Sequence, residues 1–255
     1  MGKLAFDAVI FDMDGVITKT AITHAAAWKK MFDEYLQKHA YETGEPFKEF
    51  TQGDYLTYVD GKPRYKGVAS FLESRNISIA FGDTSDEPGM ETICGLGNRK
   101  NEAFNEVIAR DGVEVYESTA QLLNDLQAAG IKLGVASSSK NCAPVLEAVD
   151  MLKIFGARVD GVVSAELGLH GKPEPDIFTT ACEMLESVPA KAIVVEDAVS
   201  GVQAGAKGEF GLTLGIAREN NEKELADNGA DFVVTDLEEL GGISGLNNLF
   251  LKNNK

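Results

Sequence analysis

The sequence predicts an α/β fold, namely a doubly wound parallel sheet with an inserted α-helical domain. Three observations support this prediction. Four short runs of apolar or β-branched residues have the length of buried strands, the stretches between them have helical spacing, and one long block has helical patterns only. Continuous apolar strands that alternate with helices are typical of a parallel sheet covered by helices.

The four strand-like runs stand at residues 8–12, 131–137, 192–197 and 212–217. Each has about the length of a strand in a globular protein, and each is apolar along most of that length. A further run, FVV at 232–234, is an additional strand candidate. These runs predict the central sheet.

Helical spacing is clearest at residues 118–130, where Leu122, Leu123 and Leu126 recur three and four positions apart. Gly130 closes this stretch, and glycine commonly ends helices. We therefore expect a helix that ends at Gly130.

The inserted domain is predicted from residues 20–110, which have helical patterns and no candidate for a central strand. The insertion follows the first strand, at the edge where open α/β sheets hold their ligands. We therefore expect a core formed by residues 1–19 and 111–255 and a helical cap formed by residues 20–110. The tail, residues 244–255, is predicted to be loose or packed on the surface.

Composition and charge exclude several classes of function. Forty acidic against 24 basic residues give a formal net charge of -16, which repels nucleic acid and anionic membranes. No apolar stretch approaches the roughly 20 residues of a membrane span, and Asp7 and Asp12 interrupt the N-terminal apolar run. We expect a cytoplasmic protein, monomeric or weakly homo-oligomeric. Three widely spaced cysteines predict neither disulfides nor a zinc site, and they are Cys94, Cys142 and Cys182.

Polar side chains stand where three of the strand-like runs end. Asp12 and Asp14 stand at or just after the end of the first run, Ser137 at the end of the second, and Glu196 and Asp197 at the end of the third. In a parallel sheet these ends converge on one edge. Four carboxylates crowded there repel one another unless a hard cation lies among them, and oxygen ligands of this kind suit Mg²⁺. The sequence therefore predicts a magnesium site.

A magnesium site of this kind also predicts a phosphate ligand. A phosphate needs hydroxyl and amide donors and a positive charge, for which Ser137 and Lys172 are the candidates. Pro173 and Pro175 stiffen the loop that presents Lys172. A carboxylate such as Asp12 can attack a phosphoryl group in line once the phosphoryl charge is neutralised.

Four motifs occur in order across nearly the whole chain: FDMDGV, VASSSKN, GKPEPDIF and VVEDAVSGVQAG. As a set they resemble the four motifs of the haloacid dehalogenase (HAD) superfamily of phosphotransferases. The segments DGVITKTAITHAAAW and RKN resemble, more narrowly, its β-phosphoglucomutase subfamily. The resemblance implies a HAD-like Rossmannoid core with a helical cap domain.

The resemblance implies a role for each motif residue. Asp12 is the nucleophile that takes up phosphate, and Asp14 is the general acid and base. Ser137 and Lys172 bind the transferring phosphate. The implied magnesium ligands are Asp12, the backbone carbonyl of Asp14, Glu196 and Asp197.

Substrate contacts are implied by the same resemblance. In the cap, His24 helps to position Asp14, Trp28 shapes the sugar pocket, and Lys100 contacts the sugar. Arg64 is the candidate that binds the distal phosphate of the substrate. The residues implied to recognise the phosphate and the sugar from the second motif are Ser138, Lys140 and Asn141.

Simpler explanations remain open for the cap residues. A single histidine on a helix, such as His24, is often only a surface or interhelical residue. Trp28 has helical spacing with Phe32, so packing inside the cap explains it as well. Arg64 and Lys100 stand in a chain with many solvated charges.

Two functions remain open within the family. The first is a Mg²⁺-dependent phosphohexomutase that converts a β-sugar 1-phosphate to the 6-phosphate through an aspartyl-phosphate at Asp12. The alternative is a sugar-phosphate phosphatase, and a binding module without turnover is a third possibility from another class. In both enzymes the partner is a small phosphorylated sugar. Lys19 stands at a hinge position where the family usually has aspartate. The resemblance therefore does not fix how the cap closes in this protein.

Overall fold

The computed structural model of the protein describes residues 4–254. The chain forms two compact units. The sheet unit comprises Met1–Lys19 and Val113–Lys255, and the helical unit comprises Thr20–Gly112. The chain therefore passes from one unit to the other twice.

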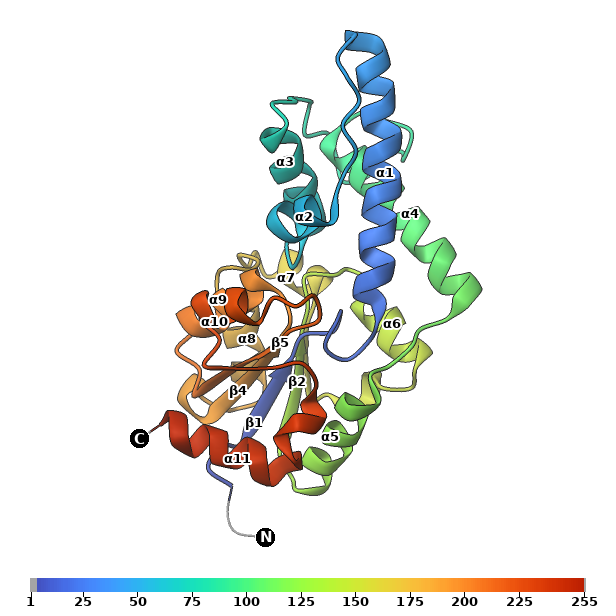
Figure 1. Cartoon of the computed structure of the whole chain (residues 1–255). Coiled ribbons are helices and arrows are strands. Elements are labelled where there is room, and N and C mark those ends of the chain that lie inside the picture. Colours follow the sequence, from blue (N-terminus) through green and yellow to red (C-terminus); the bar gives the residue numbers. More distant parts are fainter. Residues whose placement is uncertain (1–3, 255) are drawn as a thin grey trace. The chain divides into compact units, whose positions relative to one another are not determined.

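The sheet unit contains one sheet of six parallel strands in the order β3-β2-β1-β4-β5-β6 (Figure 1). The predicted α/β class, a doubly wound parallel sheet, is confirmed, and all five predicted runs contain strands. The short strand β3 was not predicted, because it has only three residues and a charged residue, Arg158, at its centre. The strands are β1 Ala8–Phe11, β2 Lys132–Ala136, β3 Ala157–Val159, β4 Ala192–Glu196, β5 Leu212–Ile216 and β6 Phe232–Val234.

Strand register brings the predicted site residues to one level. Phe11 of β1 is opposite Val135 of β2 and Val195 of β4. The Asp12 backbone N–H continues the ladder by donating to the carbonyl of Val195 at 2.9 Å. The carboxyl ends of β2, β1 and β4 therefore lie side by side, as expected for a parallel sheet.

Alternation along the strands gives both faces of the sheet an apolar surface. Ile10 and Val194 share a buried cluster with Phe178 of helix α8 (Asp176–Met184) and Ala204 of helix α9 (Val199–Lys207). Val9, next to Ile10 in the chain, is also completely buried, and successive strand side chains point to opposite faces. Both faces are therefore covered, which explains why the strands are apolar throughout.

Helices connect the strands of the sheet unit. The C-terminal tail forms a regular helix, α11, with Leu246 and Phe250 buried. Of the two predicted states, loose or packed on the surface, the structure has the packed one. Its apolar side chains recur three and four residues apart and pack beside α5 and β5. The helices are α5 Glu117–Ala128, α6 Cys142–Ala148, α7 Gly161–Glu166, α8 Asp176–Met184, α9 Val199–Lys207, α10 Glu222–Asp227 and α11 Gly242–Asn253, with short 3-10 turns at Leu152–Ile154, Pro189–Lys191 and Leu237–Leu240.

The helical unit is built around two long helices, α1 and α4, which lie side by side (Figure 1). Its core is rich in aromatic side chains, among them Phe32, Phe50 and Phe71, whose ring centroids lie 4.3–4.9 Å apart. Thr92 caps α4 by accepting a hydrogen bond from the Gly95 N–H at 2.9 Å. The helices are α1 Thr20–Thr43, α2 Gln52–Asp54, the π-helical turn Tyr55–Val59, α3 Arg64–Ser74 and α4 Ile93–Asp111.

Two further observations concern the cysteines and the lengths of the helices. The three cysteines are buried, and within residues 4–254 they form no disulfide. No helix in the same part of the chain combines the length and the apolar character needed to cross a membrane.

Candidate active site

A tight turn after β1 holds the two aspartates of the first motif. Asp12 is only 5% exposed, whereas Asp14 is half-buried. The N–H groups of Ile17 and Thr18 both donate to the carbonyl of Met13 at 2.9 Å, so the backbone folds back just beyond Asp12. This turn keeps both carboxyl groups at the carboxyl edge of the sheet.

Lys172 lies between two buried carboxylates. Its ammonium donates hydrogen bonds to Asp12 and to Glu196, and Lys172 itself is 2% exposed. The other oxygen of the Glu196 carboxylate accepts a bond from the Ala198 N–H at 2.7 Å. Three predicted site residues, from three separate segments, thus form one hydrogen-bonded triad.

The electrostatics of the triad follow from its burial. Burial raises the pKa of the Asp12 carboxyl well above its ordinary value of 3.8; Lys172 opposes this rise, and the carboxylates of Glu196 and Asp14 add to it. Burial alone would lower the pKa of Lys172, but Asp12 and Glu196 outweigh it and raise that pKa above its ordinary value of 10.5. One ammonium shared by two buried carboxylates leaves an excess of negative charge, which favours an added proton or cation.

Glycines make room for the Glu196-Asp197 pair. Gly15 has φ +85°, and a Cβ atom at this position would overlap the Asp197 carboxylate, 2.6 Å from its Cγ. A Cβ atom on Gly201 would overlap the Glu196 carboxylate in the same way. Both acidic side chains therefore depend on a bare backbone beside them.

The loop after β2 carries the serines of the second motif. Ser137 is 1% exposed, and its Oγ accepts a hydrogen bond from the Ser139 N–H at 3.0 Å. Burial raises the pKa of the Cys142 thiol, and the charges of Asp14 and Asp12 add to this rise, so the start of α6 is within electrostatic reach of both aspartates. The other predicted residues of this loop are half-buried Ser138, exposed Lys140 and half-buried Asn141.

The acidic residues suit a hard cation in chemistry and in charge. Their oxygens are ligands of the kind that Mg²⁺ prefers, and the negative charge of the triad is in excess. Across residues 4–254, however, no three His, Cys, Asp or Glu side chains are grouped as a metal site, and Lys172 occupies the space between Asp12 and Glu196. The predicted metal ligands remain a prediction.

Sequence reasoning missed Arg218, which follows β5. Its Nε donates to the carbonyl of Gly15 at 2.9 Å, inside the turn that holds the aspartates. The segment ARENNEKE gives no sign of this contact, because Arg218 stands among other charged residues and lies 203 positions from Gly15.

Lys19 is paired within the sheet unit. Its ammonium donates to the Glu114 carboxylate at 2.8 Å, and its N–H donates to the Glu114 carbonyl, also at 2.8 Å. The hydrogen bond to Glu114 raises the pKa of Lys19 and lowers that of Glu114. The lysine at this expected hinge position thus joins the two segments that lead into and out of the helical unit.

Three of the predicted cap residues meet in the helical unit. The Lys100 ammonium is hydrogen-bonded to His24 Nδ1 and lies 5.0 Å from the centroid of the Trp28 ring. The His24 ring stacks on Phe104, with the centroids 4.0 Å apart. Lys100 is 3% exposed, so it is not an ordinary solvated lysine.

Arg64, the fourth predicted cap residue, is bound to α4 by neutral groups. Its guanidinium donates to Asn101 Oδ1 at 2.7 Å and to Asn98 Oδ1 at 3.4 Å. Burial lowers its pKa. Both partners are neutral amides, and the guanidinium carbon also lies 5.9 Å from the centroid of the Tyr65 ring.

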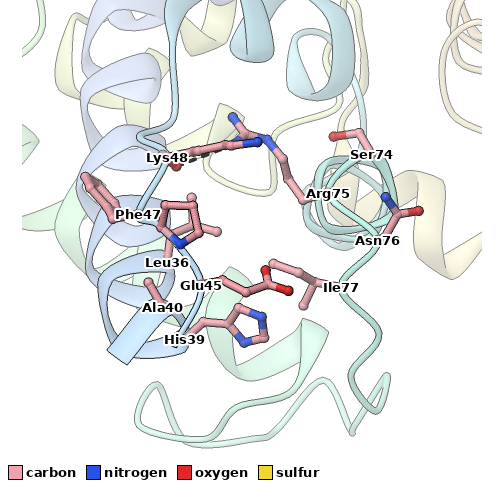
Figure 2. Close-up of a pocket in the computed structure, with 11 residues that line it drawn as sticks. Leu36, His39, Ala40, Glu45, Phe47, Lys48, Ser74, Arg75, Asn76 and Ile77 are labelled. Carbon is pink, nitrogen blue, oxygen red and sulfur yellow. Dashed lines mark hydrogen bonds between the residues drawn. The ribbon is translucent and has the colours of Figure 1, made fainter. Parts of the chain in front are cut away.

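A separate pocket of about 220 Å³ lies elsewhere in the helical unit. Figure 2 shows Glu45 and Ile77 near its centre, with Lys48 and Arg75 above them. Arg75 is already engaged, because it donates to the Asp54 carboxylate at 2.9 Å. The pocket contains none of the predicted substrate-binding residues.

Comparisons with known proteins agree with the motif set. A family model described as haloacid dehalogenase-like hydrolase matches residues 6–208. A β-phosphoglucomutase of Mycobacterium bovis is 46% identical over 237 residues, which cover 91% of this chain and 90% of the relative. A β-phosphoglucomutase of Bacillus subtilis is 34% identical, with 91% of each chain covered. A phosphorylated carbohydrates phosphatase of Thermotoga maritima is 27% identical, covering 88% of this chain and 92% of its own.

A solved structure also matches along the whole chain. The crystal structure of a β-phosphoglucomutase from Clostridium difficile superposes with a TM-score of 0.76 at 25% identity. The match covers 97% of this chain and 98% of that one. It therefore includes both the sheet unit and the helical unit.

Proposed function

Because this chain belongs to the haloacid dehalogenase-like hydrolase family, and within it is a β-phosphoglucomutase-like phosphotransferase, we propose that it is a phosphohexomutase. The proposed reaction converts a β-sugar 1-phosphate to the 6-phosphate and depends on Mg²⁺. The observation that carries the proposal is the 46% identity to a β-phosphoglucomutase over about nine tenths of both chains.

Asp12 is the proposed nucleophile. Its carboxylate attacks phosphorus, the bond from phosphorus to the leaving oxygen breaks, and an aspartyl-phosphate forms. The neighbouring ammonium of Lys172 supports this role, since its raised pKa keeps it positively charged beside the incoming phosphate. Ser137, buried at the end of the next strand, is the proposed hydroxyl partner of the same phosphate.

Asp14 is the proposed general acid and base. When the aspartyl-phosphate passes its phosphoryl group to the sugar, Asp14 accepts the proton of the C6 hydroxyl. The bisphosphorylated sugar then turns round, Asp12 takes the phosphoryl group from C1, and Asp14 returns the proton to the O1 oxygen. Asp14 is half-buried where Asp12 is buried, which gives the two carboxyl groups the different surroundings that two roles need.

Magnesium is the proposed cofactor. When bound, it would neutralise the charge of the transferring phosphoryl group. The excess negative charge around Asp12 supports a cation here. The proposed ligands are Asp12, the Asp14 carbonyl, Glu196 and Asp197.

The substrate is proposed to be a small phosphorylated sugar. The guanidinium of Arg64, which is hydrogen-bonded to neutral amides, supports a second phosphate contact, and buried Lys100 with His24 and Trp28 supports a sugar contact. The helical unit is thus proposed to act as the cap and the sheet unit as the phosphotransferase core. The remaining proposed sugar-phosphate contacts are Ser138, Lys140 and Asn141. We further propose a cytoplasmic monomer or weak homo-oligomer, with neither nucleic acid nor membrane as a partner.

The test follows two products at once. The protein is incubated with Mg²⁺, β-glucose 1-phosphate and a trace of glucose 1,6-bisphosphate, and glucose 6-phosphate and inorganic phosphate are measured separately. Rapid formation of glucose 6-phosphate with little released phosphate is the expected result. An Asp12→Asn variant serves as the control and is expected to form neither product.

A phosphatase is the alternative proposal. The similarity to the phosphorylated carbohydrates phosphatase of Thermotoga maritima favours it, and the same Asp12 chemistry serves both reactions with water as the acceptor. Release of phosphate from several sugar phosphates, with no isomer formed, would select this alternative.

A further inference from the structure

Arg218 holds the turn that carries the two aspartates. Besides its 2.9 Å bond to the Gly15 carbonyl, it donates to the Thr235 carbonyl at 3.1 Å and contacts the Asp236 carboxylate at 3.4 Å. Its side chain is 15% exposed. The guanidinium therefore joins the first motif to the loop after β6.

Tyr116 fixes the guanidinium plane from one side. The guanidinium carbon of Arg218 lies 3.6 Å from the centroid of the Tyr116 ring, a close cation–π contact. Tyr116 is itself tied to the turn, because its N–H donates to the Ile17 carbonyl at 3.0 Å. The turn is thus held at two carbonyls, those of Gly15 and Ile17.

Gly15 lies between the guanidinium and the acidic pair. Its carbonyl accepts from Arg218, while its Cα faces the Asp197 carboxylate so closely that no side chain fits. Burial raises the pKa of Tyr116; the charge of Arg218 opposes this rise and the charge of Asp197 adds to it, so this carboxylate is also near the ring. A shift of the Gly15 peptide would move the backbone next to Asp14. It would also change the space available to the Asp197 carboxylate.

One nitrogen of the Arg218 guanidinium is buried without a hydrogen bond in the described part of the chain. Among the groups that the structure describes, its Nη2 atom is buried and has no hydrogen-bond partner. An unsatisfied buried donor costs free energy, which offsets the bonds that the other nitrogens make. The unsatisfied Nη2 atom therefore offsets part of the stability that the other contacts of Arg218 contribute.

We propose that Arg218 is a positioning residue for phosphoryl transfer, which acts by holding the Gly15 carbonyl and so fixing the backbone that presents Asp12 and Asp14. The reaction it serves is the one given above, so this inference rests on the proposed function. Because Arg218 acts on the turn and is not itself assigned to the substrate, its loss changes turnover more than substrate affinity.

The experiment compares Arg218→Ala and Arg218→Lys with Arg110→Ala, a control that removes an exposed arginine paired with its neighbour Asp111. For Arg218→Ala we expect kcat to fall about 10- to 100-fold, since a misplacement of about 1 Å can cost that much. We expect KM to change less than about threefold, and millimolar guanidinium ion to restore part of kcat by refilling the vacated place. The lysine variant is expected to be intermediate, because an ammonium reaches one carbonyl without forming the fork.

Backbone hydrogen exchange gives a readout that does not depend on activity. The N–H groups of Gly15, Ile17 and Thr18 are all hydrogen-bonded within the turn. We expect them to exchange at least about tenfold faster in Arg218→Ala than in the wild type or the control variant. Faster exchange confined to residues 13–18 would distinguish loss of positioning from general unfolding.

Two results would overturn the inference. One is that residues 13–18 of Arg218→Ala exchange their backbone hydrogens at the wild-type rates. The other is that the loss of kcat equals the unfolded fraction of the variant and that added guanidinium ion restores none of it. If Arg218→Ala does not fold, Arg218→Lys and Tyr116→Leu carry the same comparison. A wild-type protein without phosphoryl transfer would contradict the proposed function, while the exchange data would still decide whether Arg218 holds the turn.

Discussion

Lys172 and Asp12 form a hydrogen-bonded ion pair inside the sheet unit, with both side chains almost completely buried. The same ammonium also binds Glu196, so one positive charge serves two carboxylates. The pair is therefore not a closed, neutral unit. Its stability and its chemistry both depend on the unbalanced charge.

Removal of the lysine charge should destabilise the protein strongly. In Lys172→Met two buried carboxylates lose their common cation, and breaking a buried ion pair from one side typically costs about 3–5 kcal/mol. The free energy of unfolding from urea titration measures this loss. The matched control is Lys172→Met with Glu196→Gln, which removes one negative charge as well. We expect the double variant to recover part of the stability and none of the activity, and equal stability of the two variants would contradict this account of the triad.

Asp12→Asn should abolish turnover and yet raise the stability of the metal-free protein at neutral pH. The pKa of Asp12 is raised in the folded state, so the folded state binds the proton more tightly than the unfolded state and stability falls as pH rises through this range. Asparagine removes that penalty. We expect a gain of a few degrees in Tm at pH 7 in EDTA, since about 1 kcal/mol corresponds to roughly 2–4 °C in a chain of this size.

The gain from Asp12→Asn should itself depend on pH. It should be complete above the raised pKa of Asp12 and should disappear as pH falls below the ordinary value of 3.8, where the wild-type carboxyl is protonated in both states. Melting curves of the wild type and the variant across this range check the sign. A gain that stays constant at every pH would contradict a raised pKa.

The rate at which Asp12 is phosphorylated should fall at acid pH, and the pH at which it falls should depend on the Mg²⁺ concentration. The protonated carboxyl is not a nucleophile, and its raised pKa places this loss above the range usual for aspartate. A nearby divalent charge favours the carboxylate, so higher Mg²⁺ should move the acid limb to lower pH. Phosphoenzyme formation from acetyl phosphate, measured across pH at low and high Mg²⁺, tests this shift. Lys172 should contribute no loss below its ordinary pKa of 10.5, because its pKa is raised.

Much of the site was predictable because strand ends and motif order are local properties of the sequence. Asp12, Ser137 and Glu196 each stand at the end of an apolar run, and the parallel register of the strands brings these ends to one edge of the sheet. Contacts between distant, unremarkable residues were not predictable in this way. Arg218 meets Gly15 across 203 positions, and only tertiary structure brings the two together.

Errors in the predicted fold have a similar physical origin. Strand β3 has three residues, too few to give a recognisable pattern, and its place beside β2 comes from pairing in the sheet. The helix of the tail was also not predicted: LNNLFLKNNK is rich in asparagine, yet Leu246 and Phe250 of α11 are buried in the sheet unit. Burial of a few apolar residues outweighed the weak helix propensity of asparagine.

Lys100→Met should weaken substrate binding. Methionine keeps most of the volume packed between the Trp28 and Phe104 rings, which lie 5.0 and 5.1 Å from the ammonium, but it removes the charge proposed to contact the sugar. A hydrogen bond to a charged group contributes about 1.5–3 kcal/mol, so KM should rise roughly tenfold or more. Lys66→Met, on an exposed position of α3, is the matched control and should leave KM unchanged. An equal effect of both variants would assign Lys100 to packing alone.

Gly15→Ala should disable the site far more than it destabilises the backbone. Gly15 and Gly130 have φ values of +85° and +75°, so the conformational free-energy cost of alanine is similar at the two positions. Only at Gly15 does the added Cβ overlap a neighbour, the Asp197 carboxylate, whereas at Gly130 nothing lies within 4 Å. Gly130→Ala should therefore lose about 1 kcal/mol of stability and keep its activity. Gly15→Ala should lose at least 100-fold in kcat/KM, about 2.7 kcal/mol, because Asp197 must leave its place beside the turn. Similar activities in the two variants would mean that the position of Asp197 is not needed for the reaction.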